Sequence, residues 1–207
     1  MGRSVTVTGR GRASAAYDEA TLRLAAAARA ANPSDATARA TYAMAQIRDA
    51  VLAGGVDASA LTTTNVSLSP VHDPWPTVVA YEASLGLAVR LLDLSRVGSL
   101  LVAAIDAGGD GARIDGISFS HQDAAALERE ARDAAFADAR SKAEQYAGLA
   151  GQALGEVRHV VEGGADGPVA LRKGVMAVAA AAPVPIDAGE GTVVADVSVT
   201  WTLGPAV

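Results

Sequence analysis

The chain of 207 residues contains no cysteine, which excludes disulfide bonds and thiol chemistry. Aromatic residues make up only 4% although hydrophobic residues reach 50%, so we expect a core of alanine, leucine, valine and isoleucine. No apolar run approaches the ~18 residues that a membrane-spanning helix needs. The N-terminal run MGRSVTVTGRG has no apolar leader. As it stands the sequence predicts a cytoplasmic protein, and the alternative is a periplasmic or secreted protein whose leader has been removed.

The charge balance is acidic, with 17 Lys and Arg against 23 Asp and Glu and a net charge of −6. This argues against nucleic-acid binding, which requires a basic surface that displaces counterions from phosphates. The chain also lacks GxSxG, SxxK, HExxH and GxxxxGK[ST] motifs, so it falls in none of the well-marked enzyme classes. We therefore expect no catalytic residues, no cofactor and no metal.

Hydrophobic periodicity divides the chain into strands and helices. Alternation predicts strands at Val5–Thr8, Ala20–Ala31, Leu61–Val71, Val78–Leu92, Val157–Val161 and Thr192–Leu203, and a strand around Ile114, Ile117 and Phe119. Helical spacing predicts helices from Pro33 to about Ala53, from Asp93 to Gly108, and from about His121 to Ala147. The expected buried stripes are Ala40, Met44, Ile47 and Val51; Leu94, Val97, Leu101, Ala104 and Ile105; and Leu127, Ala131, Ala135, Ala139, Ala143 and Tyr146.

This order predicts an α+β fold of antiparallel or mixed sheets with helices packed on one face, long strands and one long helix. The halves 1–92 and 93–207 weakly repeat the same pattern, but together they form a single unit. The strands Val78–Leu92 and Thr192–Leu203 are expected to leave open edges, which pair readily with other chains. We therefore expect a homo-oligomer.

Two groups of residues are candidates for chemistry. Gly9–Ser14 has the GxGxx-small form of a dinucleotide loop, but the next segment is predicted as a strand, whereas such a loop leads into a helix. The favoured interpretation is a strand bent at glycine with exposed arginines. His72, His121 and His159 are widely spaced, so a metal site would require ligands that converge from separate elements.

Two further segments are candidate contact surfaces. Trp75 lies between two prolines on a turn, where it either anchors a partner or folds back on its own domain. Residues 163–191 are rich in glycine, alanine and proline and predict an irregular arm. The apolar residues Val175, Met176 and Val178 of this arm are the other candidate interface residues.

Several runs in the chain resemble one family. They are Val5–Gly11 (VTVTGRG), Asn65–Asp73 (NVSLSPVHD), Tyr81–Ser84, Asp93–Gly98, Gly116–Ser120 (GISFS), Pro185–Ile186 and Gly189–Glu190. Together they resemble the SIMPL-domain family, a domain of unknown function whose members include periplasmic immunogenic and oxidative-stress defence proteins. The resemblance implies an α+β protein that is often exported, with some relatives forming ring- or channel-like oligomers and some linked to stress tolerance or, in animals, to a signalling kinase. The family has no agreed catalytic residues, so none is carried over.

From these observations we expect a non-enzymatic, self-associating binding or scaffolding protein. The alternative is an enzyme or small-ligand carrier with a pocket between the two halves. A deep cleft with converging histidines or carboxylates would favour the alternative, and a shallow apolar interface would favour self-association.

Overall fold

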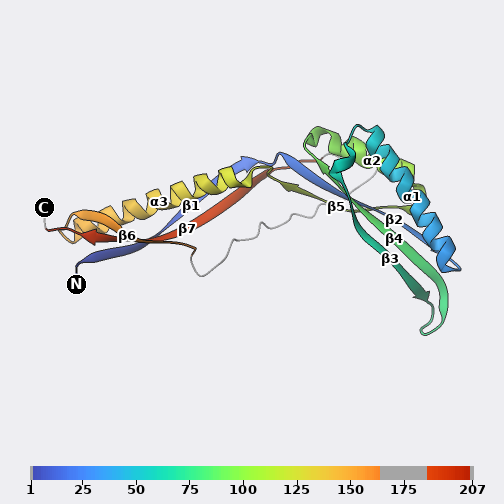
Figure 1. The fold of residues 1–207 in the computed structure, drawn as a ribbon, viewed down its shortest axis with the longest axis horizontal. Helices are drawn as coiled ribbons and strands as arrows, with labels where there is room; N and C mark the ends of the chain where they lie inside the picture. Colours follow the sequence, from blue (N-terminus) through green and yellow to red (C-terminus); the bar gives the residue numbers. More distant parts are fainter. Residues whose placement is uncertain (1, 164–185, 206–207) are drawn as a thin grey trace. The chain divides into compact units, whose positions relative to one another are not determined.

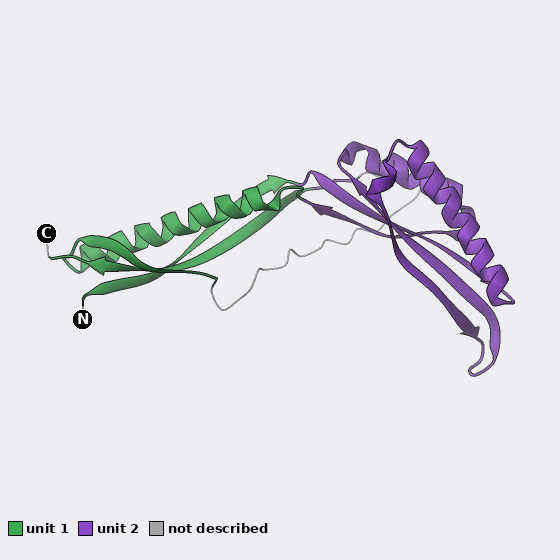
Figure 2. Ribbon diagram, in the orientation of Figure 1, with its two compact units in different colours: residues 1–16, 121–173, 189–207 green, residues 17–120, 174–188 purple. Residues whose placement is uncertain are grey.

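The computed structural model describes residues 2–163 and 186–205, which form two compact units. Unit 1 contains residues 2–16, 121–163 and 189–205, and unit 2 contains residues 17–120 and 186–188 (Figure 2). These boundaries differ from the repeated halves 1–92 and 93–207, because the two ends of the chain pair in one sheet. Val175, Met176 and Val178 lie outside the described residues. The last two residues of the expected arm, Glu190 and Gly191, belong to β7 (Glu190–Leu203).

Unit 1 is a three-stranded antiparallel sheet with one long helix on one face (Figure 1). The strand order is β1 (Ser4–Ala16), β7 (Glu190–Leu203), β6 (Leu154–Glu162). Alternate residues of β7 face α3 (Ala124–Leu149) and are buried, Val199 fully and Trp201 at 3% exposure. The opposite face is polar, and Thr6 bonds Thr200 and Thr8 bonds Ser198 across β1 and β7.

The helix α3 buries a stripe made almost entirely of alanine. Its buried residues are Leu127, Ala131, Ala135, Ala139, Ala143 and Ala147. The helix begins later than predicted, at Ala124, because the Asp123 side chain accepts the N–H of Ala126 as N-cap. The prediction for Tyr146 was wrong: its side chain is 55% exposed, and Ala147, one position further round the helix, is buried instead.

Unit 2 is a four-stranded antiparallel sheet with two helices. The strand order is β3 (Leu61–His72), β4 (Val78–Leu91), β2 (Glu19–Ala30), β5 (Ala112–Ser120). The helices α1 (Pro33–Ala53) and α2 (Val97–Gly108) bury Ile47, Val51 and Leu101 with β2 and β4 in the main hydrophobic core.

Helix α1 has the limits that the sequence predicts. Asn32 is its N-cap and accepts the N–H of Asp35, Pro33 occupies the first turn, and Gly54 is its C-cap. In α2 the prediction for Ile105 was wrong, because this side chain is 38% exposed and Leu100 is buried in its place. Asp93 caps a short 3-10 turn, Leu94–Arg96, that precedes α2.

The expectation of open edges was wrong for both strands to which it was applied. β4 lies between β3 and β2, and β7 lies between β1 and β6, so both are interior strands. The edges of the two sheets are β1 and β6 in unit 1, and β3 and β5 in unit 2. The long alternating patterns arise because one face of each strand is buried. A central strand and an edge strand can both have one buried face, so the pattern does not distinguish them.

Candidate functional site

The Gly9–Ser14 segment has a structural role in unit 1. It continues β1 without interruption, as the strand interpretation of this segment predicts, and Gly9 and Gly11 face α3. A Cβ on Gly9 would lie 2.7 Å from the Cβ of Ala139 and closer still to the carbonyl oxygen of Ala135. The two glycines therefore allow the alanine stripe of α3 to approach the strand, and no helix follows them as a dinucleotide loop requires.

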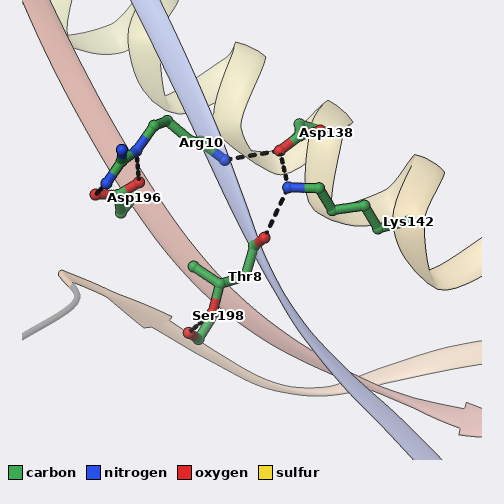
Figure 3. Close-up of polar contacts among 6 residues, drawn as sticks. All are labelled: Thr8, Arg10, Asp138, Lys142, Asp196 and Ser198. Atoms are coloured by element: carbon green, nitrogen blue, oxygen red, sulfur yellow. Dashed lines mark hydrogen bonds and ion pairs between the residues drawn. The ribbon is translucent and has the colours of Figure 1, made fainter.

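A polar cluster closes the outer edge of β1 (Figure 3). Lys142 of α3 donates to the carbonyl oxygen of Thr8 at 3.0 Å, and the N–H of Arg10 donates to Asp138 Oδ2 at 2.8 Å. Lys142 and Asp138 also pair with each other at 2.6 Å. Two backbone groups of β1 are thus occupied by side chains of α3, which hinders pairing of this edge with another strand.

The charges in this cluster shift two carboxyl groups. The hydrogen bond from Lys142, and then that from the Arg10 N–H, lowers the pKa of Asp138. Arg10 also holds Asp196 through Nε at 2.7 Å and Nη2 at 3.0 Å, and this hydrogen bonding lowers the pKa of Asp196. The cluster is built from satisfied pairs, so its geometry indicates a structural clamp.

A hollow of about 270 Å³ lies in unit 1 between α3 and the strands β6 and β7. Its apolar lining includes Phe136 and Val160, and Arg132 lies at its border. Arg132 is already paired with Glu162 at 2.6 Å and with Glu128 at 3.0 Å. Its charge is neutralised by these two carboxylates, so the hollow offers little to an anionic ligand.

The three histidines lie in separate elements. His72 ends β3, His159 lies in β6 of the other unit, and His121 precedes α3. Within residues 2–163 and 186–205 no three His, Asp or Glu side chains are grouped so that they could hold a metal ion. None of the helices in the same residues combines the length and hydropathy that crossing a bilayer requires.

Several exposed apolar side chains of unit 2 lie on the β3 hairpin, which we define as β3, the turn Asp73–Thr77 and the start of β4. Figure 1 shows β3 beside β4 on the outside of the sheet, joined to it by this turn. The exposed large apolar side chains of the hairpin are Val66 (70%), Leu68 (49%), Trp75 (78%), Val78 (44%) and Val79 (51%).

Trp75 projects from the turn of this hairpin. The indole ring contacts the ring of His72, with 4.3 Å between centroids, and most of its surface is exposed. Of the two alternatives that the sequence left open, the structure therefore places Trp75 outside the core of its unit.

The inner face of β3, which is its face on the helix side of the sheet, is left partly uncovered by the helices at Val66 and Leu68. Val66 and Leu68 pair with Leu85 and Ala83 of β4, and paired residues point to the same face. Ala83 is buried against Ala36 and Ala40 of α1, so Val66 and Leu68 lie on the same face of the sheet that α1 covers at β4. Beside it a second hollow of about 150 Å³ is lined by Met44, Arg48, Ala58, Leu61, Thr63, Leu85, Gly86 and Leu87.

The four sheet edges differ in their protection. The edge of β1 is covered by Lys142 and Asp138. β6 and β5 are short strands of nine residues, and both carry charges within the strand (Glu156, Arg158 and Glu162 in β6; Arg113 and Asp115 in β5). β3 is a 12-residue strand with no Asp, Glu, Lys or Arg. It lacks the charges with which natural edges avoid pairing, a signal that was present in the sequence but needed the strand order to be interpreted.

Comparison with known proteins agrees with the resemblance noted above. A family model described as SIMPL, protein of unknown function (DUF541), matches residues 5–201. The chain is also similar to two proteins named 26 kDa periplasmic immunogenic protein, from Brucella melitensis biotype 1 and Brucella abortus strain S19. Each is 29% identical over 216 residues, covering 96% of this chain and 84% of the relative. Because the family model spans nearly the whole chain, this protein belongs to the SIMPL family, proteins of unknown function.

Proposed function

We propose that the protein is a non-enzymatic scaffolding protein that self-associates through the β3 edge. The observation that carries this proposal is the lack of charge along β3, together with the exposure of Val66 and Leu68 on its inner face. An edge strand directs part of its backbone N–H and C=O groups outward, where another strand can bind them. Burying the apolar side chains beside that edge adds a favourable hydrophobic contribution of ~25 cal/mol per Å².

The polar cluster of unit 1 supports the same proposal. Lys142 and Asp138 occupy backbone groups of Thr8 and Arg10 on the β1 edge. No comparable side-chain cover lies on β3 within the described residues. Association is therefore directed to the 12-residue β3 of unit 2 rather than to the 13-residue β1 of unit 1.

We also propose that the protein acts in the periplasm. The support is that both relatives are named periplasmic proteins and cover 96% of this chain. Fractionation of cells that express the complete natural gene tests this location. Recovery of the protein with the osmotic-shock fraction is the expected result, and recovery only with the cytosol would contradict it.

The self-association is tested by light scattering over a range of protein concentrations. We expect a mass that rises to a multiple of the 20.7 kDa chain, and a return towards 20.7 kDa in Val66→Lys, which places a charge on the β3 edge. Ser34→Lys adds the same charge at an exposed position of α1 and should keep the wild-type mass. A wild-type mass of 20.7 kDa at every concentration would refute the proposal. A small molecule retained in native mass spectrometry of such a monomer would favour the ligand carrier instead.

A further inference from the structure

The orientation of the β3 backbone follows from Pro70. Proline has no N–H, so within a sheet it occupies edge strands with its nitrogen directed away from the neighbouring strand. The pairing of β3 with β4 is regular from Asn65 to Val71. Because strand residues alternate, the N–H and C=O groups of Val66 and Leu68 point outward together with the Pro70 nitrogen, whereas those of Ser67 point towards β4.

The chemistry of this edge suits an identical edge. A chain with a net charge of −6 repels its own copies, and this repulsion is smallest where a long surface carries no charge. A two-fold axis also brings the same patch together from both copies, so the patch must complement itself. The partner that fits β3 is therefore a second copy of this chain.

The outward-facing groups select one register. A two-fold antiparallel pair can be centred on Val66, Ser67 or Leu68. Centring on Val66 places Leu68 opposite Thr64, where the pairing with β4 is irregular. Centring on Leu68 places Val66 opposite Pro70, which lacks a donor. Centring on Ser67 places Val66 opposite the partner's Leu68, twice, with all donors and acceptors of both residues available.

This register also brings the hairpin turn to a complementary surface. In an antiparallel pair centred on Ser67, a residue that lies a given number of positions after Ser67 in one copy is opposite the residue the same number of positions before Ser67 in the other, in the direction of Leu61. Trp75, beyond the end of β3, therefore reaches the 3-10 turn Ala58–Ala60 that precedes the partner's β3. Ala58 and Leu61 line the hollow of about 150 Å³, together with Met44 and Arg48 of α1.

The exposed indole and the hollow are suited to each other. Methionine packs favourably against aromatic rings, and an arginine above an indole face forms a cation–π contact. Because the two features lie near opposite ends of one strand, a two-fold antiparallel pair fills both hollows at once.

We infer that two copies pair β3 to β3 in antiparallel orientation about a two-fold axis at Ser67, with Trp75 of each copy seated at the partner's Ala58–Leu61 hollow. This inference rests on the proposed self-association and specifies its geometry.

Disulfide formation between single-cysteine variants tests the register, because these 207 residues contain no cysteine. Ser67 would face its own copy as a non-hydrogen-bonded pair, with a Cα–Cα distance of about 4.5 Å, which a disulfide can bridge. We expect Ser67→Cys to cross-link alone under mild oxidation. Asn65→Cys and Ser69→Cys should cross-link poorly alone but efficiently when mixed in equal amounts. Ser34→Cys on α1 is the control for random collision.

A second variant tests whether the Trp75 indole occupies the partner's Ala58–Leu61 hollow. Trp75→Ala removes one anchoring side chain from each copy, and at about tenfold for each anchor it should weaken the dimer about a hundredfold. Circular dichroism confirms that each variant is folded.

The outcomes are distinguishable. Efficient cross-linking of Asn65→Cys or Ser69→Cys alone, with none at Ser67→Cys, would overturn the register. A wild-type oligomer in which no β3 cysteine cross-links above the Ser34→Cys control would overturn β3 pairing here and in the proposed function, and would assign self-association to another surface. A dimer unchanged by Trp75→Ala would overturn the indole seat. A wild-type monomer by light scattering would overturn both the inference and the proposed function.

Discussion

Gly9 of β1 lies directly against the backbone of α3 at Ala135. A side chain at position 9 would have no room, because its Cβ would lie within 2.7 Å of the Ala139 Cβ and nearer still to the Ala135 carbonyl oxygen. Gly11 meets the same helix one turn earlier, at Ala131. Small residues on both elements thus set the distance between the sheet and the helix of unit 1.

Gly9→Ala should therefore destabilise the protein by about 3 kcal/mol, as overpacking against a rigid backbone does. Gly148→Ala is the matched control, because Gly148 lies in α3 and an added Cβ meets nothing within 4 Å. That substitution should increase stability slightly, since alanine favours a helix by about 1 kcal/mol over glycine. Urea unfolding curves of the three proteins measure both effects, and equal stability of Gly9→Ala and wild type would refute the close-packing account.

Asp138 links the stability of unit 1 to pH. The pKa of Asp138 is lowered in the folded protein, so the group contributes stability above the ordinary aspartate pKa of about 3.9. That contribution is lost as the pH falls through the lowered folded pKa. The Asp196 pKa is lowered in the same direction by Arg10, so the two groups act together.

Asp138→Asn should make thermal stability less dependent on pH in this acidic range. Asp133→Asn changes an exposed aspartate of the same helix and serves as the control, with the acid dependence of the wild type retained. Melting temperatures measured from neutral pH down to about pH 2 give the comparison. Identical profiles for Asp138→Asn and the wild type would show that the β1 clamp contributes nothing.

Arg96 connects the start of α2 to the end of α1. Its side chain is partly buried and donates to the carbonyl oxygen of Gly54, the C-cap of α1. Arg96→Ala should destabilise the protein by about 2 kcal/mol, the value for a hydrogen bond from a charged donor. Arg39→Ala, an exposed change on α1, should have little effect in the same denaturant measurement. A similar loss in both variants would assign the effect to general charge rather than to this contact.

Local sequence signals predicted the elements that have strong boundary residues. Asn32 and Pro33 define the start of α1, and the alternation of Leu22 with Leu24 predicted β2 although its alanines favour a helix. Ile105 and Tyr146 were misassigned because they lie at the borders of helical stripes, where neighbouring packing decides burial.

The strand order was beyond the reach of periodicity. β1 pairs with β7 from Ser4 and Thr202 to Ala16 and Glu190, so the partners come from opposite ends of the chain. Alternation shows which face of a strand is buried but does not identify its neighbour. For the same reason β3 could not be recognised as an uncharged edge, although each of its residues was visible in the sequence.

The proposed β3 interface depends most directly on the outward orientation of the backbone N–H and C=O groups of Val66 and Leu68. Residue-resolved amide exchange at low and high protein concentration measures it. We predict that the N–H groups of Val66 and Leu68 become protected as concentration rises, while Ser67, whose N–H points towards β4, stays protected throughout. Exchange of Val66 and Leu68 that is equally fast at both concentrations, in a protein that light scattering shows to be associated, would contradict the account.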